Sequence, residues 1–166
     1  MLKLHEIFNN RVFMREIERK FLVKELPPLK GCVRYEIEQG YLATELGRSE
    51  VRLRRSNDTR CLTVKRDRDD NDGTHSRDEV NITLNQEQWD TLWKMTEGRR
   101  VTKIRYDVPC GEWTVEVDLF KGKNEGIITA EVEFPDAASS HAFQPPSWLG
   151  EEVTRSPQYS NWQLAG

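Results

Sequence analysis

The sequence predicts a mainly β domain of the α+β class, in which about eight antiparallel strands close into a barrel. Three observations carry this prediction: apolar and polar residues alternate with a period of two in eight segments, short connections join most neighbouring segments, and one segment has a clear helical pattern. Short connections favour antiparallel pairing, and closure into a barrel removes the exposed edges of the sheet.

The strands are expected in order along the chain at 14–24, 33–44, 51–56, 60–66, 76–84, 100–109, 112–120 and 127–135. Asn57-Asp58-Thr59 separates the third strand from the fourth and favours the tight turn of a β-hairpin. No repeat or flexible linker divides residues 14–166, which we interpret as one domain. Residues 1–13 are either an N-terminal extension or an ordinary N-terminal helix packed on the domain.

The clear helix is expected at 86–97. Asn85 can act as its N-cap, and Gln88 stands at the third helical position, as in a capping box. Gly98 can end the helix. One face then carries Trp89, Leu92 and Trp93, a spacing typical of core packing rather than of a ligand platform. Short helices are also expected at 137–143 and in the C-terminal tail.

Composition and charge exclude several classes of protein. The net charge is −3, from 25 basic and 28 acidic residues, so no overall basic field indicates nucleic-acid binding. No segment is long and apolar enough to span a membrane, and the first residues lack the apolar run of a signal peptide. The three cysteines, Cys32, Cys61 and Cys110, lack metal or redox spacing; reduced thiols fit a cytoplasmic protein.

Charged residues that are two apart in a strand share one face of the sheet. Nearly every predicted strand has one ionic and one apolar face, and many charges come as pairs of the same sign. The acidic pairs are Glu16 with Glu18, Glu116 with Asp118, and Glu131 with Glu133, and the basic pairs are Arg52 with Arg54 and Lys103 with Arg105. Lys20, Lys65, Arg77 and Glu79 lie on similar faces.

Any one of these faces alone is more simply explained as the wet side of an antiparallel sheet. The whole set is harder to explain in this way, because like charges two residues apart repel each other. A bound partner would offset the repulsion, since acidic pairs attract a cation and basic pairs attract an anion. In a closed barrel the charged faces would meet in one lumen, and helices, including the one at 86–97, would cover part of the apolar outside.

This charge pattern favours a metal-assisted reaction on a phosphate compound. Clustered carboxylates without His or Cys suit hard divalent cations such as Mg²⁺ or Mn²⁺. Lys and Arg side chains from several strands suit phosphate oxygens. A metal ion and cationic side chains together are what phosphoryl transfer requires.

A series of short segments resembles the CYTH superfamily, also called triphosphate tunnel metalloenzymes, from Met14 to Ala165. The segments are EIERKFLV at 16–23, EQGYL at 38–42, VRLR at 51–54, LTVK at 62–65, RDE at 77–79, KIRY at 103–106, VEVDLF at 115–120, AEVEF at 130–134 and YSN at 159–161. The E-x-E-x-K motif alone would be weak, but in this order the signal is strong. The chain looks most like the compact bacterial inorganic triphosphatases.

The resemblance implies an eight-stranded antiparallel β tunnel with a charged lumen and metal-dependent hydrolysis of a triphosphate with release of phosphate. Inorganic triphosphate is the first expectation, with nucleoside triphosphates as further substrates. A class IV-type adenylate cyclase and a non-catalytic polyphosphate- or nucleotide-binding module remain alternatives. The expected partner is the small-molecule triphosphate, without a membrane or a nucleic acid, and a homodimer is left open.

The resemblance also implies roles for individual residues. The expected metal ligands are Glu16, Glu18, Glu131 and Glu133, assisted by Glu79, Glu116 and Asp118. The expected triphosphate ligands are Lys20, Arg52, Arg54, Lys65, Arg77, Lys103 and Arg105. Catalytic roles are expected for Glu16, Glu18, Lys20, Lys65 and Glu133, with a water molecule as the nucleophile. Asn81 departs from the family pattern, in which many members have an acidic residue.

Overall fold

The computed structural model describes residues 14–45, 48–68 and 73–166, so the predicted extension at 1–13 lies outside the described residues. The strands are β1 Met14–Val23, β2 Val33–Glu45, β3 Ser49–Ser56, β4 Thr59–Asp67, β5 Ser76–Thr83, β6 Arg100–Cys110, β7 Trp113–Phe120, β8 Ile128–Phe134 and β9 Leu149–Glu152. The helices are α1 Gln86–Lys94, α2 Ala137–Ala142 and α3 Asn161–Ala165, with short 3₁₀ turns η2 Gly122–Asn124 and η3 Pro157–Tyr159.

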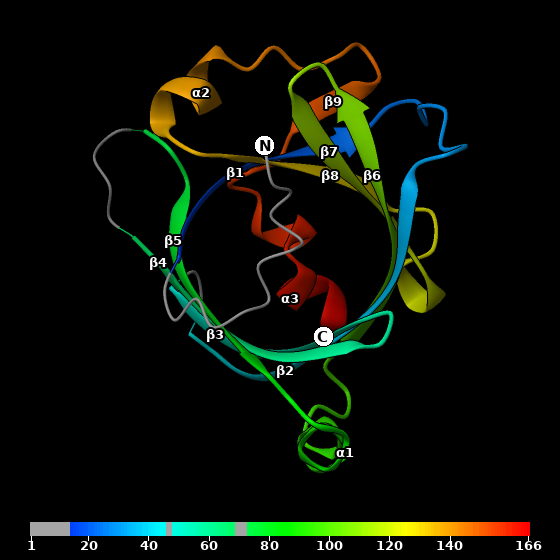
Figure 1. Ribbon diagram of the computed structural model, residues 1–166, viewed down its shortest axis with the longest axis vertical. Coiled ribbons are helices and arrows are strands. Elements are labelled where there is room, and N and C mark those ends of the chain that lie inside the picture. The colour runs from blue at the N-terminus through cyan, green and yellow to red at the C-terminus, as the bar shows by residue number, and fades with distance from the viewer. Residues whose placement is uncertain (1–13, 46–47, 69–72) are drawn as a thin grey trace.

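Eight of the strands close into an antiparallel barrel (Figure 1). Their order is β5-β4-β3-β2-β6-β7-β8-β1, and an additional pairing between β1 and β5 closes the ring. The β3–β4 hairpin turns at Asn57, which adopts a positive φ of 50°, a conformation that asparagine tolerates better than most residues. The closed barrel predicted from the sequence is therefore confirmed.

The register of the strands sorts the side chains into a charged inside and an apolar outside. Glu18 lies opposite Glu133 and Lys20 lies opposite Glu131 in the β1–β8 pairing. Directly opposed residues of an antiparallel pair point to the same face, so these charges enter the lumen together. The alternate residues Ile17 and Phe21 are buried on the other face.

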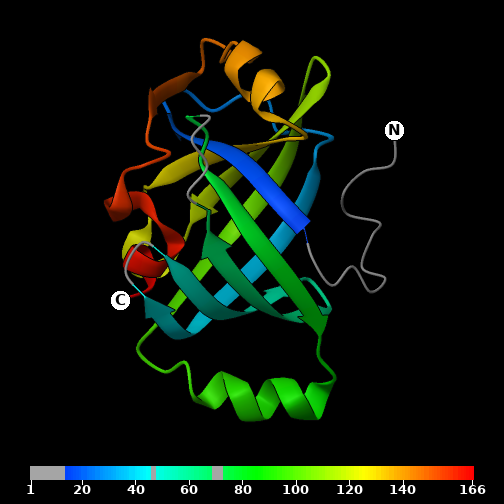
Figure 2. The same ribbon diagram turned by 90° about the vertical axis from the view of Figure 1, so that its left-hand side faces the viewer.

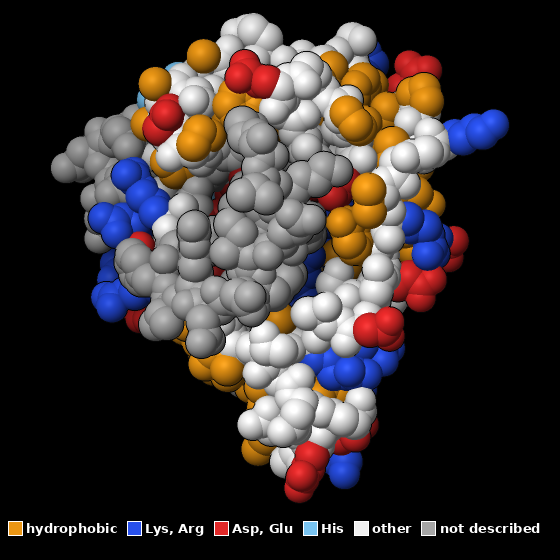
Figure 3. All heavy atoms as spheres, in the orientation of Figure 1, with side chains coloured by type: hydrophobic (Ala, Val, Ile, Leu, Met, Phe, Trp, Pro, Cys, Tyr) orange, Lys and Arg blue, Asp and Glu red, His pale blue; other side chains and the backbone are white. Residues whose placement is uncertain are grey.

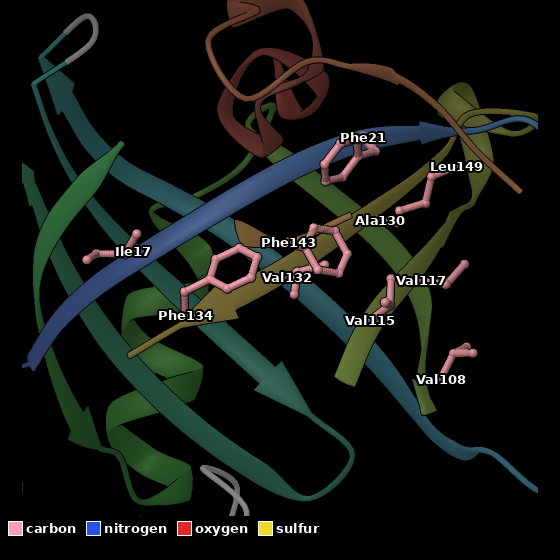
Figure 4. Packing of buried hydrophobic residues seen from close by; sticks show 10 residues of the cluster. All are labelled: Ile17, Phe21, Val108, Val115, Val117, Ala130, Val132, Phe134, Phe143 and Leu149. Atoms are coloured by element: carbon pink, nitrogen blue, oxygen red, sulfur yellow. The ribbon is translucent and has the colours of Figure 1, made fainter. Parts of the chain in front are cut away.

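The largest apolar cluster lies outside the barrel wall formed by β1, β7 and β8 (Figure 4). The rings of Phe134 on β8 and Phe143, which directly follows α2, lie 5.3 Å apart. Leu149 from β9 packs in the same cluster. Helix α2 and the chain up to β9 therefore supply the cover that the apolar strand faces need, and burial of this cluster stabilises the fold.

Helix α1 begins as predicted but ends earlier than expected. The Asn85 side chain accepts a hydrogen bond from the Gln88 backbone N–H, and the Gln88 side chain accepts one from Asn85, which forms the capping box. The last helical residue is Lys94, because the Thr96 hydroxyl and the Arg100 guanidinium donate hydrogen bonds to the Trp93 carbonyl and thereby replace a further helical turn.

Helix α1 lies outside the barrel wall, beside β2 and β3, as Figures 1 and 2 show. Trp89 is buried and stacks on Trp93 with ring centroids 4.8 Å apart, which confirms the predicted packing role of this face. The helix and the turn after it approach the barrel at Gly40 of β2. A Cβ atom there would lie 2.5 Å from the Thr96 hydroxyl oxygen.

Helix α3 lies at one end of the barrel (Figures 1 and 2). Leu164 and Ala165 pack against Tyr41, Val101 and Phe120. This places the chain from Val153 to Gln163 beside the lumen.

The sequence did not indicate β9, because its four residues are too few to show a clear alternation. In the described part of the chain, no helix is long and apolar enough to cross a membrane.

Candidate active site

A cavity of about 400 Å³ occupies the lumen of the barrel. Side chains from β1 to β6 and from β8 line it, together with the segment from Val153 to Gln163. The predicted site residues that line it are Glu16, Glu18, Lys20, Arg52, Arg54, Lys65, Arg77, Glu79, Lys103, Arg105, Glu131 and Glu133. Glu116 and Asp118 of β7 were also predicted, but they do not line the cavity.

Glu116 and Asp118 instead hold basic side chains in position. The Arg105 guanidinium donates hydrogen bonds to both oxygens of Asp118 at 2.7 Å, to Glu131 at 2.8 Å and to Glu116. The Lys103 ammonium lies 2.6 Å from Asp118, which is fully buried. Burial alone would raise the pKa of Asp118, but Arg105 and Lys103 lower it. These two acids are therefore paired below the surface of the cavity.

Lys65 joins two carboxylates on neighbouring strands. Its ammonium lies 2.6 Å from Glu16 on β1 and 2.6 Å from Glu79 on β5. Although burial opposes ionisation, Lys65 and Arg52 lower the pKa of Glu79 to about 2. The Asn81 side chain also donates a hydrogen bond to Glu79. The amide at this position therefore supports the ionised Glu79.

Glu18 and Glu133 are the two lumen carboxylates whose charge is least compensated. In the described residues neither forms an ion pair with Lys or Arg, and the His75 ring lies 4.0 Å from Glu18. Burial, reinforced by Glu16 and Glu131, raises the pKa of Glu18 to about 7. Burial and the nearby Glu116 and Glu16 raise the pKa of Glu133 well above its usual range. A cation between these groups would relieve both effects.

Glu131 differs from Glu133 although both lie on the same face of β8. The Lys20 ammonium lies 3.0 Å from Glu131, and Arg105 binds its other oxygen. Burial opposes ionisation, but Lys20 and Arg105 outweigh it and lower the pKa of Glu131 well below its usual range. This glutamate is already neutralised by protein cations.

Strand β3 lies across the lumen from β1 and β8 and carries buried hydrogen-bond donors of Arg52 and Arg54. Arg52 pairs with Glu50 at 3.0 Å, but its buried Nε atom has no hydrogen-bond partner among the described residues. Arg54 likewise has a buried Nε without a partner, and we find no ion pair for it in the described ranges. Burial and the nearby Arg105 and Arg52 lower the pKa of Arg54. Such buried, unsatisfied guanidinium groups favour an anionic ligand.

Lys103 lies deepest among the basic residues of the lumen. Burial and the neighbouring Arg105, offset in part by Asp118, lower its pKa to about 8. Its ammonium lies 3.0 Å from the amide oxygen of Asn161 at the start of α3. The C-terminal helix therefore reaches a lumen side chain directly.

Several lining residues had no role in the sequence-based site. Gln39 and Tyr41 lie on one face of β2, and the Gln39 amide donates to the Tyr41 hydroxyl at 3.3 Å. Glu50 stands two residues before Arg52, so strand parity alone places it on the same face. Asn161 belongs to the YSN segment of the family resemblance, but strand parity gives no signal for it or for Trp162, because their approach depends on how the C-terminal tail folds back.

The donor set of the lumen fits a hard divalent cation. Glu18 and Glu133 supply oxygen ligands that form no ion pair with Lys or Arg among the described residues, and Glu16 lies close enough to raise the pKa of both. Among the residues that the structure describes, no group of three or more His, Cys, Asp or Glu is already gathered tightly enough to hold a metal ion. A bound cation would therefore have to draw these carboxylates closer together.

Comparisons with known proteins place the chain in a family. The CYTH domain model matches residues 14–160. An inorganic triphosphatase from Nitrosomonas europaea is 40% identical over 154 residues, which are 92% of this chain and 97% of that protein. One from Acetivibrio thermocellus is 36% identical over 157 residues, which are 90% of this chain and 92% of that protein.

A solved crystal structure of an inorganic triphosphatase is also similar, with a TM-score of 0.66 and 37% sequence identity. The match covers 90% of this chain and 93% of that chain. The family model, the two relatives and this structure each match about nine-tenths of the chain. The protein therefore belongs to the CYTH domain family.

Proposed function

We propose that this protein hydrolyses inorganic triphosphate, with release of phosphate, in a reaction that depends on Mg²⁺ or Mn²⁺. The observation that carries the proposal is that acidic and basic side chains with unmet charge or hydrogen bonds line one cavity. The carboxylates of Glu18 and Glu133 form no ion pair with Lys or Arg in the described ranges, and the Nε atoms of Arg52 and Arg54 have no hydrogen-bond partner there. All four side chains line the same cavity of about 400 Å³. A polyanion with a divalent cation neutralises both sets of groups.

The names of the similar proteins support the same substrate. Both curated relatives are inorganic triphosphatases, and the chain covers more than nine-tenths of each. We extend that activity to this chain because its lumen retains acidic and basic side chains suited to a metal-bound triphosphate. A cytoplasmic location is part of the proposal and fits the three free thiols.

In the proposed site, Glu18 and Glu133 hold the cation, with Glu16 as the next oxygen ligand. Arg52, Arg54, Lys65 and Arg77 bind phosphate oxygens from the wall formed by β3, β4 and β5, while Lys20, Lys103 and Arg105 bind from β1 and β6. The bound cation would withdraw charge from the phosphate that is attacked and would help to orient a water molecule. Enclosure of the site in the barrel strengthens these electrostatic contacts.

Phosphate release from inorganic triphosphate, ATP and pyrophosphate tests the proposal, with each substrate assayed in Mg²⁺ and in Mn²⁺. We expect turnover of inorganic triphosphate by the wild type and a loss of about a hundredfold or more in Glu18→Gln and in Lys65→Met. Arg34→Met is the control, because Arg34 pairs with Glu36 on the exposed surface. Wild-type protein that turns over no triphosphate with either metal would refute the proposal.

The same assay with ATP separates hydrolysis from cyclisation. A triphosphatase releases ADP and phosphate from ATP, whereas an adenylate cyclase releases cyclic AMP and pyrophosphate. Triphosphate that binds in chelator but is not hydrolysed after metal is restored would instead support a non-catalytic binding module.

A further inference from the structure

The Lys103 ammonium is held by two oxygen atoms from different parts of the chain. It donates to Asp118 Oδ2 at 2.6 Å and to Asn161 Oδ1 at 3.0 Å. Lys103 is 1% exposed, and its nitrogen lies 5.4 Å from the centroid of the Phe120 ring. A lysine ammonium can donate but cannot accept, so the oxygen of the Asn161 amide, and not its nitrogen, must face it.

Asn161 is held firmly by the rest of α3. The Trp162 ring packs edge-on against Tyr41 with centroids 5.5 Å apart. The Lys123 ammonium donates to the carbonyl of Ala165 at 2.9 Å, and the Asn124 side chain donates to that of Leu164 at 2.7 Å. These contacts hold the short helix in place, and its first residue, Asn161, reaches Lys103 from there.

An ammonium group has three N–H bonds in a tetrahedral arrangement, so two fixed acceptors determine the direction of the third. In the described part of the chain, we find no third hydrogen-bond acceptor for Lys103, which lines the cavity. Because Lys103 lines the cavity, a ligand in the lumen is the candidate for this third acceptor.

We propose that Asn161 is a positioning residue, which fixes the Lys103 ammonium so that its remaining N–H bond meets a phosphate oxygen of the substrate. The inference rests on the proposed function, because it takes the ligand of Lys103 to be a triphosphate. Without Asn161, Asp118 alone holds the ammonium, which then rotates and leans toward this carboxylate. The role extends the site to the C-terminal helix.

A double-mutant cycle tests whether Asn161 acts through Lys103. We expect Asn161→Ala to lower kcat/KM for inorganic triphosphate by about tenfold in the wild-type background and less than about twofold in the Lys103→Met background. Gln158→Ala, an exposed amide in η3, is the control and should leave kcat/KM unchanged. Equal losses in both backgrounds, or no loss in either, would overturn the proposal.

A second readout needs no substrate and so separates this inference from the proposed function. In the metal-free protein near pH 6, the Lys103 ammonium should give a slowly exchanging ¹⁵N NMR signal, assigned by its loss in Lys103→Met. Asn161→Ala should speed its proton exchange several-fold, whereas Asn161→Asp, which keeps an acceptor oxygen, should not. Unchanged exchange in a folded Asn161→Ala protein contradicts the inference, even if wild-type protein proves inactive on triphosphate.

Discussion

Two glutamates on the same face of one strand have opposite ionisation behaviour in this lumen. Lys20 and Arg105 contact Glu131 and lower its pKa, whereas no Lys or Arg among the described residues forms an ion pair with Glu133, whose pKa is raised. The sequence predicts that both side chains enter the lumen, because they are two apart in a strand. It does not predict this difference, which depends on cations from β1 and β6 that are distant in the chain.

The raised pKa of Glu18 makes the stability of the metal-free protein depend on pH. Its pKa rises from an ordinary 4.5 to about 7 on folding, so the folded state binds more protons than the unfolded state in this interval. The free energy of unfolding should therefore fall as the pH rises from about 4.5 to 7, and Glu18→Gln should remove on the order of 3 kcal/mol of that fall.

Urea denaturation in chelator at pH 5 and at pH 7 measures this difference. The exposed Glu36 offers the matched control Glu36→Gln, which should keep the wild-type dependence on pH. An identical pH dependence in wild type and Glu18→Gln would contradict the assignment of the raised pKa to Glu18.

Arg105 lines the lumen and also contributes to the free energy of unfolding. It is 5% exposed and contacts Asp118, Glu116 and Glu131, so Arg105→Met leaves buried carboxylates without their main cation. We expect a loss of about 3–5 kcal/mol in the free energy of unfolding, measured by chemical denaturation at pH 7. Arg34→Met, on an exposed pair, should leave the unfolding midpoint unchanged. Equal midpoints for both variants would show that the Arg105 cluster is not structurally important.

At the scale of elements, the sequence predicted those with a long, regular pattern and missed those that depend on a tertiary partner. Strand β1 and helix α1 could be predicted from their periods of two and 3.6 residues. Strand β9 could not, because its four residues become a strand only where β1 offers a free edge beyond its pairing with β5. The end of α1 was wrong by three residues, because Arg100 and Thr96 bind the Trp93 carbonyl.

The end of α1 and the turn after it approach β2 closely at Gly40. A Cβ atom added there would lie 2.6 Å from the Thr96 Cβ and 2.8 Å from the Trp93 ring. Gly40→Ala should therefore lower the free energy of unfolding by about 1–3 kcal/mol, since the turn or the ring must shift. Ala43→Ser adds one atom to an exposed side chain of the same strand and serves as the control in thermal denaturation. A melting temperature for Gly40→Ala equal to that of the control would contradict this account of the packing.

At the scale of the whole molecule, the barrel could be predicted because many strands share one pattern, with charged residues on one face and apolar residues on the other. A solvated face explains one strand, but a common lumen explains like-charged pairs on β1, β3, β6 and β8 together. The pairing of acids with bases across that lumen could not be predicted, because it depends on barrel closure. Closure leaves Glu116 and Asp118 behind Arg105 and brings Glu18 and Glu133 to the cavity.

The most direct test of the central claim is the rate of phosphate release from inorganic triphosphate, measured with Mg²⁺ or Mn²⁺ and again in excess chelator. The lumen described here predicts rapid release by wild-type protein with metal, none in chelator, and a loss of about a hundredfold in folded Glu133→Gln protein. Release that persists in chelator, or a Glu133→Gln protein as active as wild type, would contradict a metal-dependent triphosphatase built on these carboxylates.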